Sequence, residues 1–261
     1  MPKNTTCIFC NQNREKAKEH IWPKWLQIYL NGSLLEQYQG THLSSTPGII
    51  ISQRNQNGST LVCGNVCKIC NNGWMNDLES AFKPIYESIH QNYSRLSHLN
   101  KEERNTIAQW GYKTGLVINA GSNYRKIVPD KHYSSFYKNK IIPKNIKIDI
   151  AKIDSDKLLV WEQSNIFSST VSASEMDKFD PYDMVKSSYV ITMQIGHLGI
   201  RISYYKDCKK LGYSLPNNEN KKVLRIRPYS ANCGFNIYNA LDSILSFHYG
   251  AHINKIGLKK I

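Results

Sequence analysis

The sequence has no long apolar segment and no apolar leader. Its 261 residues contain no uninterrupted apolar run near the roughly 20 residues that a membrane-spanning helix needs. The first ten residues, MPKNTTCIFC, lack the apolar core of a secretion signal. We therefore expect a soluble, cytoplasmic protein without a membrane partner. In that reducing compartment the seven cysteines indicate metal ligation and not disulfides.

Acidic residues are scarce beside basic ones. The chain has 20 Asp and Glu against 34 Lys and Arg, a formal net charge of +14. The first 80 residues carry +2 of this charge and residues 81–261 carry +12. A basic chain favours a polyanionic partner such as nucleic acid, held mainly by the second part. The bias toward Lys, Asn and Ile is also typical of an AT-rich genome, which would explain the charge without a partner.

Two Cys-x-x-Cys pairs, Cys7 with Cys10 and Cys67 with Cys70, are the clearest chemical pattern. Two knuckles of this spacing can supply four thiolates to one tetrahedral zinc ion. Cys63 is an alternative ligand, but it ends the apolar run STLVC, where a strand would bury it as a small hydrophobic residue. We therefore assign the zinc ligands to the two pairs. A purely structural zinc knuckle would use the same cysteines.

Three polar residues near the cysteine pairs suggest more than a structural zinc site. Glu19 and His20 lie between the pairs, and Asn71 directly follows the last cysteine. Carboxylate and amide oxygens suit magnesium, and an imidazole that titrates near neutral pH can act as a general base. The structural alternatives are a histidine bonded to a backbone carbonyl and an asparagine that caps a helix. We interpret Asn76, one turn further on, as an exposed helix residue.

The order CxxC, Glu-His followed by Pro, then CxxC-Asn resembles the HNH nuclease superfamily, in particular its zinc-ribbon members of the endonuclease VII kind. The similarity covers residue 7 to about residue 80. It implies a ββα fold in which Glu19 and Asn71 hold a catalytic Mg²⁺ or Mn²⁺, His20 is the general base and the zinc is structural. Glutamate stands where aspartate is the commoner acid in this family. The fifty or so residues between the pairs indicate an insertion.

Local patterns predict the elements of this module, which we assign to residues 1–94. WPKWLQIYL predicts a short helix from Pro23 to near Asn31. GIIIS and STLVC flank Asn57-Gly58, which predicts a two-stranded hairpin leading into the second knuckle. A helix should follow from about Asn72 and be kinked or ended by Pro84.

Residues 95–261 predict a basic α+β domain with a mainly antiparallel sheet. Asn100 should cap the helix KEERNTIAQWGYKTGLVINAG, in which we interpret Trp110 as core and Lys113 as a solvated charge. A last helix is expected over about Asn236 to Tyr249. Five alternating stretches predict the strands: NIKIDIAKI, KLLVWEQ, SSYVITMQIG, LGIRISYY and KKVLRIRP, with GHLG as a tight connection.

This second region contains no metal-ligand spacing, glycine-rich phosphate loop or nucleophile elbow. We interpret its isolated histidines as structural: His197, His248 and His252. Three arginines on predicted strands could line a nucleic-acid groove, although an ordinary basic sheet surface explains them equally well: Arg201, Arg225 and Arg227.

The sequence thus predicts an α+β protein that is a metal-dependent HNH-type endonuclease, hydrolysing phosphodiester bonds in DNA, with RNA left open. Restriction, phage defence and mobile-element roles are all compatible with the resemblance. The main alternative is a non-catalytic zinc-ribbon DNA-binding protein. A third is a nuclease-derived toxin or defence effector that acts only when triggered.

Overall fold

The computed structural model describes residues 3–43, 50–122, 126–165, 188–205, 213–214, 222–229, 235, 239–253 and 259–260. The fold is α+β, as the sequence predicts, and its largest sheet has five strands, every neighbouring pair of which is antiparallel. Within the described residues, no helix combines the length and the apolar character that a bilayer span requires.

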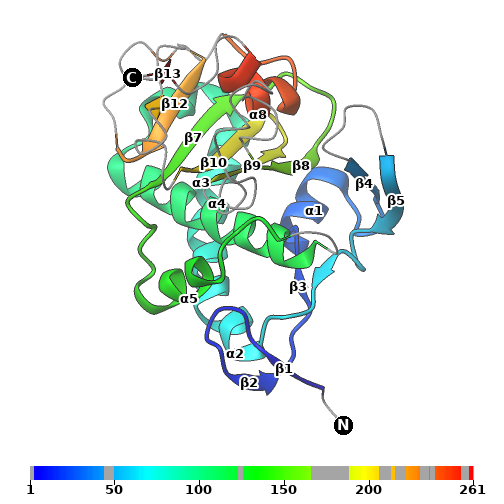
Figure 1. Ribbon diagram of the computed structural model, residues 1–261. Coiled ribbons are helices and arrows are strands. Elements are labelled where there is room, and N and C mark those ends of the chain that lie inside the picture. The colour runs from blue at the N-terminus through cyan, green and yellow to red at the C-terminus, as the bar shows by residue number, and fades with distance from the viewer. Residues whose placement is uncertain are drawn as a thin grey trace.

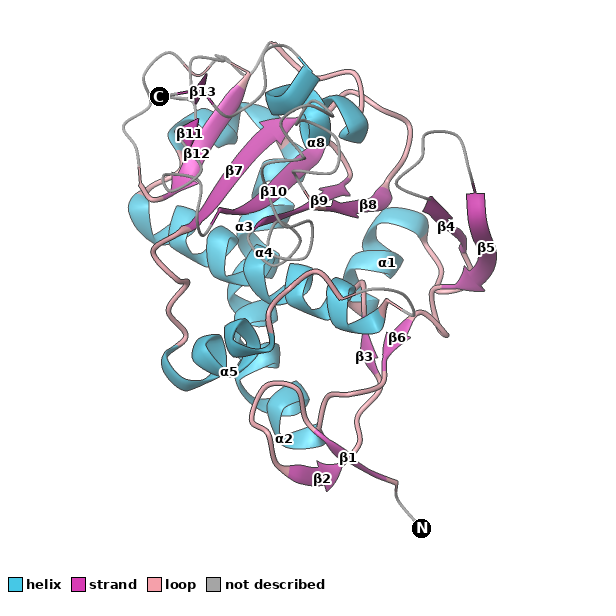
Figure 2. Ribbon diagram, in the orientation of Figure 1, coloured by secondary structure: helices cyan, strands magenta, loops and turns pink. Residues whose placement is uncertain are grey.

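The five-stranded sheet lies between two helices, α4 (Lys101–Gly121) and α8 (Ile244–Ile253) (Figures 1 and 2). Its strands lie in the order β12 (Val223–Arg227), β7 (Ile146–Lys152), β10 (Leu198–Tyr205), β9 (Ser188–Ile195) and β8 (Leu159–Ser164). Because side chains alternate along a strand, β10 presents Ile200 and Ile202 to α4 and Arg201 to α8. All five predicted strands are therefore present, and the GHLG turn joins β9 to β10 as predicted.

Helix α4 approaches the sheet closely because two of its glycines have no side chain. A Cβ at Gly111 would lie 2.9 Å from Cγ2 of Ile200, and a Cβ at Gly115 would lie 2.5 Å from Cδ1 of Ile202. The helix is capped by Asn100, as the sequence predicts, and Glu103 completes a capping box with it.

The N-terminal part consists of short strands and helices. The first hairpin is β1 (Asn4–Thr6) with β2 (Asn13–Glu15), and a second pair is β3 (Glu19–His20) with β6 (Val62–Cys63). Between β3 and β6 lie α1 (Lys24–Asn31), as predicted, and the strands β4 (Gln37–Leu43) and β5 (Ile50–Asn57). The chain then forms α2 (Lys68–Cys70), the π-helical turn η1 (Asn71–Met75) and α3 (Asn76–Gln91).

The remaining described elements are short. They are η2 (Tyr93–His98), α5 (Asp130–Asn139), and the pair β11 (Tyr213–Ser214) with β13 (Lys259–Lys260). Helix α5 was not among the predicted elements. The predicted C-terminal helix begins later than expected, at Ile244, and part of its expected range lies outside the described residues.

The prediction of a two-stranded hairpin around Asn57-Gly58 is wrong. The chain turns there, with Thr60 N–H donating to the carbonyl of Asn57, but the strands on either side do not pair with each other. Instead β5 pairs with β4, and β6 pairs with β3. The local signal located the turn correctly, whereas strand pairing was decided by partners distant in sequence.

Pro84 does not end α3, which continues to Gln91. Proline removes one backbone donor, and the carbonyl that this donor would have reached belongs to Ser80. Ser80 and Pro84 are both exposed, so water can hydrogen-bond to that carbonyl. The cost of the proline is therefore small at this position.

One continuous apolar core includes residues from both predicted domains, 1–94 and 95–261. Phe82 of α3 stacks on Trp110 of α4 with ring centroids 3.9 Å apart, and Trp22 packs edge-on against Trp161 of β8. Trp110 is fully buried, as expected of a core residue. The strand pair β3–β6 and helix α3 are thus supported directly by α4 and the sheet.

Candidate metal centre and acid–imidazole site

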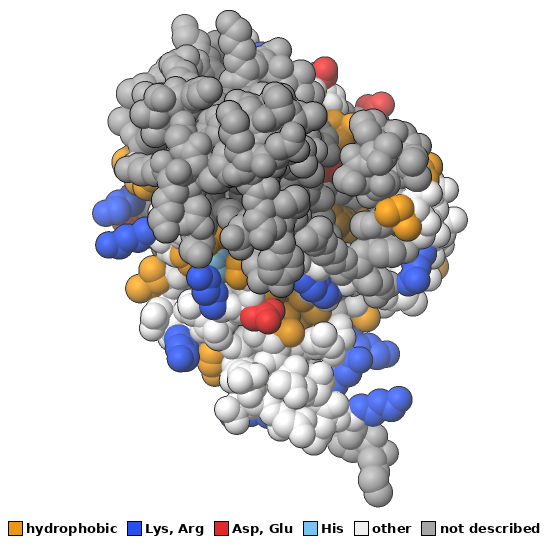
Figure 3. Space-filling model, in the orientation of Figure 1, with side chains coloured by type: hydrophobic (Ala, Val, Ile, Leu, Met, Phe, Trp, Pro, Cys, Tyr) orange, Lys and Arg blue, Asp and Glu red, His pale blue; other side chains and the backbone are white. Residues whose placement is uncertain are grey.

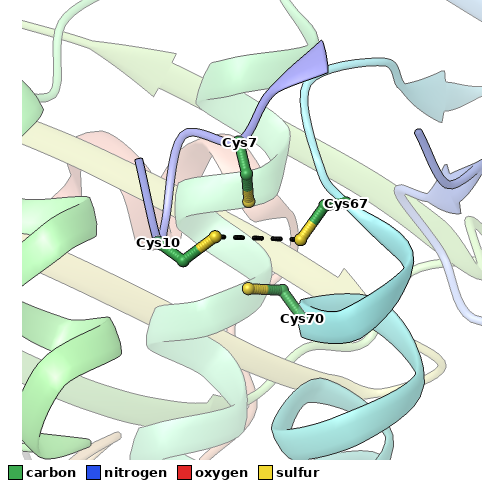
Figure 4. Close-up of side chains that lie close together, drawn as sticks. All are labelled: Cys7, Cys10, Cys67 and Cys70. Atoms are coloured by element: carbon green, nitrogen blue, oxygen red, sulfur yellow. Dashed lines mark hydrogen bonds between the residues drawn. The ribbon is translucent and has the colours of Figure 1, made fainter. Parts of the chain in front are cut away.

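The four paired cysteines form one compact cluster. The sulfur atoms of Cys7, Cys10, Cys67 and Cys70 all lie within 4.8 Å of one another, and Figure 4 shows them turned toward a common centre. A tetrahedral zinc ion with Zn–S bonds of about 2.3 Å places its sulfurs about 3.8 Å apart. The Cys10 and Cys67 sulfurs are 3.8 Å apart. The donor set and its dimensions therefore fit a metal ion such as zinc.

Each knuckle is fixed by backbone hydrogen bonds. In the turn between β1 and β2, Cys7 N–H donates to Gln12, and Asn11, at a positive φ of 54°, donates to Cys7. In the second knuckle Cys67 lies just before α2, and its carbonyl accepts from Asn71 N–H. The N–H of Ile8 donates to Asn65 and so joins the two knuckles.

The thiols perturb one another strongly. The hydrogen bond from the Cys70 thiol lowers the pKa of Cys7 to about 4, against the effect of burial. The hydrogen bond with Cys7 and burial raise the pKa of Cys70. Thiols this crowded favour a cation that would neutralise several thiolates together. Cys63 is fully buried on β6 opposite Glu19 and is not part of the cluster.

Glu19 belongs to a buried charge cluster that no local sequence pattern indicates. Lys113 Nζ, on α4, lies 2.9 Å from Oε1 of Glu79 on α3 and 3.4 Å from Oε1 of Glu19 on β3. The Lys113 side chain is 1% exposed, those of Glu19 and Glu79 7% and 20%. The prediction that Lys113 is a solvated charge is therefore wrong. Its ammonium lies over the buried Trp110 ring, 5.9 Å from the ring centroid, and joins two carboxylates from separate elements.

The two carboxylates of this cluster do not share the lysine equally. Burial raises the pKa of Glu19 to about 7, and the attraction of Lys113 only partly offsets it. Burial lowers the pKa of Lys113, but the charges of Glu79 and then Glu19 raise it by a larger amount. The ammonium therefore stays charged. Lys113 and Glu79 thus form the closer ion pair. For Glu19, the attraction of Lys113 does not fully offset the cost of burying a charged carboxylate.

His20 directly follows Glu19 on β3. Burial and the charge of Lys24 lower the pKa of His20, which favours the neutral imidazole at pH 7. Backbone hydrogen bonds with Lys18 and Ser59 act in the opposite direction, and so does the charge of Glu79. The backbone-bonded histidine that was the structural alternative is therefore compatible with the geometry, and so is a neutral base.

Asn71 opens the π-helical turn η1 directly after the second knuckle. Its Nδ2 donates to Oδ1 of Asn72 at 3.3 Å, and its backbone N–H bonds to Cys67. The contacts described for Glu19 are instead with Lys113 of α4. The carboxylate that shares Lys113 with Glu19 is Glu79 of α3, which comes near Lys113 because α3 packs against α4.

Two of the three strand arginines point into the protein. Asp149 on β7 accepts hydrogen bonds from Arg201 at 3.0 Å and from Arg225 at 2.9 Å, across the register of three neighbouring strands. Arg201 is 6% exposed, and Arg227 donates to the carbonyl of Ile142. The hypothesis that Arg201 and Arg225 line a nucleic-acid groove is therefore wrong. Both arginines instead pair with Asp149 on the neighbouring strand β7.

Two of the three isolated histidines of the second region, His197 and His248, make structural hydrogen bonds, as predicted. His197 Nδ1 bonds to the carbonyl of Ile153 at 2.8 Å, and the buried His248 bonds to Ser164 and Thr192. The side chain of His252 lies outside the described residues. On the face drawn in Figure 3, Lys and Arg side chains are spread along the lower part of the molecule, and Asp and Glu are fewer.

Comparisons of the chain with protein-family models, with curated proteins and with solved structures found no match.

Proposed function

We propose that this protein is a metal-dependent endonuclease of the HNH type, acting on phosphodiester bonds in DNA. The observation that carries the proposal is the placement of His20. It directly follows Glu19 on β3, which pairs with β6, and β6 leads into the cysteine knuckle and the helical segments α2, η1 and α3. This order of two antiparallel strands followed by helices supports the proposal, because it is compatible with the ββα arrangement that the motif resemblance implies.

In this proposal His20 accepts a proton from the attacking water. Its lowered pKa keeps a larger share of the imidazole neutral at pH 7, the form that can act as a base. Glu19 and Asn71 would hold Mg²⁺ or Mn²⁺, and the carboxylate and amide oxygens are suitable ligands. When bound, such an ion supplies charge stabilisation to the phosphate and the leaving oxygen. The four cysteines would hold zinc as a structural ion.

Plasmid cleavage tests the proposal. Purified protein with magnesium or manganese should nick or linearise plasmid DNA, and His20→Ala should slow this by about 100-fold or more, the usual contribution of a general base. His98→Ala is the matched control, because His98 is an exposed histidine on η2. Equal rates for wild type and His20→Ala would exclude His20 as the base.

The alternative, a zinc-ribbon protein that binds DNA without cutting it, is favoured by one observation. Lys113 already supplies a positive charge to both Glu19 and Glu79, which is the neutralising role that a metal ion would otherwise have. If wild type shifts plasmid on a gel but leaves it intact with either metal, the binding function is correct. Toxicity on expression that disappears with His20→Ala would instead indicate an effector that needs a trigger.

A further inference from the structure

The insertion between the two cysteine pairs forms a two-stranded ribbon. β4 and β5 pair antiparallel with each other and with no other described strand, and they stand at the edge of the molecule beside α1 (Figures 1 and 2). Strand β3 precedes the ribbon and β6 follows it, so it projects from the strand pair that carries Glu19 and His20. The ribbon therefore belongs, with α1, to the connection between the two strands of the proposed nuclease site.

One face of this ribbon is lined by polar side chains that hydrogen-bond well to bases. The register places Gln39 opposite Asn55 and Thr41 opposite Gln53, with Gln37 one step nearer the base of the ribbon. Since alternate residues share a face, these five residues form one surface, here named the amide face. All five are exposed. Gln39 Nε2 donates to Oδ1 of Asn55 at 3.5 Å, which aligns two amides across the strands.

The base of the ribbon is held rigidly. Gly58 and Ser59 donate backbone hydrogen bonds to Glu36 and Leu34, which closes the end nearest the protein body. The buried Gln27 of α1 donates to the Gly58 carbonyl, although this bond is long at 3.5 Å. Asn31 of α1 donates to the hydroxyl of Tyr38 at 3.0 Å, on the opposite face from the amides. The amide face is thus presented outward from a fixed support.

The dimensions of the amide face match the major groove of duplex DNA. That groove is about 12 Å wide and admits a two-stranded ribbon. Successive side chains on one face of a strand lie about 6.8 Å apart, which is the rise of two base pairs. Asn and Gln are the side chains that pair bidentately with the N6 and N7 positions of adenine, and Thr contacts the thymine methyl group. A–T pairs are therefore the bases that this set of residues can distinguish.

The charge of the ribbon also favours a polyanion. Neither strand contains Asp or Glu, and β5 contributes Arg54. The major groove of A-form RNA is too deep and narrow for a ribbon to enter, so the fit is to duplex DNA.

We propose that the amide face reads A–T base pairs in the major groove of duplex DNA and so gives the protein its sequence preference. This inference rests on the proposed function in taking DNA as the substrate. Gln39 and Asn55 are the central readers, and Thr41 and Gln53 extend the contact by two base pairs. They are specificity-determining residues and take no part in the chemistry of cleavage.

A binding selection tests this proposal. The full chain, with its zinc but without magnesium, is incubated with a pool of randomised DNA duplexes, and the bound fraction is sequenced. Wild type should enrich a motif with A–T pairs at positions two base pairs apart. The double variant Gln39→Ala/Asn55→Ala should lose about 10-fold discrimination at these positions. Its affinity for the unselected pool should stay within about 3-fold, with an unchanged salt dependence, because phosphate contacts remain.

Gln56→Ala is the matched control, because Gln56 lies on the same strand but on the opposite face, across from Tyr38. This variant should enrich the wild-type motif. Three results would overturn the proposal: no motif for wild type, an unchanged motif for the double variant, or preferential binding of RNA or single strands. A protein that selects the motif but never cuts with magnesium refutes the nuclease proposal and leaves this one standing. A protein that cuts DNA with magnesium but enriches no motif refutes this inference and leaves the nuclease proposal standing.

Discussion

Replacing Lys113 with methionine is the sharpest test of the buried charge cluster. The substitution keeps the length and packing of the stem but removes the ammonium, which leaves the carboxylates of Glu19 and Glu79 without their shared cation. Breaking a buried ion pair by removing one partner costs about 3–5 kcal/mol. Each kcal/mol lowers the melting temperature of a chain this size by about 2–4 °C, so we expect a loss of about 10 °C.

The same substitution should be sensitive to pH. The pKa of Glu19 in the folded protein is raised from 4.5 to about 7, so the folded state holds an extra proton between these values and stability falls as pH rises through this range. Lys113→Met removes the positive charge that lowers the pKa of Glu19. At low pH, protonation of Glu19 then removes the cost of burying an unpaired carboxylate. The difference in stability between Lys113→Met and wild type should therefore be larger at pH 8 than at pH 5.

Thermal unfolding followed by circular dichroism, at both pH values, measures this effect. Lys83→Met is the control, because Lys83 pairs with Glu87 at 3.9 Å on the exposed side of α3. An exposed pair of this kind contributes less than about 1 kcal/mol. If Lys113→Met melts within 2 °C or so of Lys83→Met at pH 8, the cluster does not hold these helices together and the reasoning fails.

Two further predictions concern the cysteine cluster and the sheet. Wild type should contain one zinc ion per chain by elemental analysis; Cys10→Ser should bind it at least about 100-fold more weakly, whereas Cys63→Ser should keep it, and zinc loss in Cys63→Ser would contradict the assignment of ligands. Asp149→Asn should cost about 3–5 kcal/mol in urea unfolding, because the buried Arg201 and the partly buried Arg225 lose their counter-charge. Burial raises the pKa of Asp149, but Arg201 and Arg225 lower it further, so this contribution is present at neutral pH and is lost as pH falls through the lowered pKa. An unchanged denaturation midpoint at pH 7 would refute it.

Signals within a short stretch of sequence predicted local structure well. The helix cap at Asn100, the end of α1 near Asn31 and the five alternating strands are all present. The cysteine spacing predicted a cluster that the structure assembles. These features depend on residues a few positions apart, or on a ligand geometry that tolerates any intervening chain.

Pairing between distant segments was not predictable in the same way. The turn at Asn57-Gly58 was found, but β6 pairs with β3, whose residues lie about forty positions earlier. The strand arginines were expected at the surface because alternation alone does not tell which face of a sheet a helix covers. Once α8 covers one face, Arg201 is buried and needs Asp149.

The sequence by itself determined the four thiol ligands, the Glu19-His20 pair and the positions of most helices and strands, because each depends on spacing or on local propensity. Only the tertiary structure decided what surrounds Glu19. Helices α3 and α4 bring Glu79 and Lys113 to it from 60 and 94 positions away, and no local pattern records such an approach. Because Glu19 is buried there, its carboxyl group must be neutralised by a cation or by a proton.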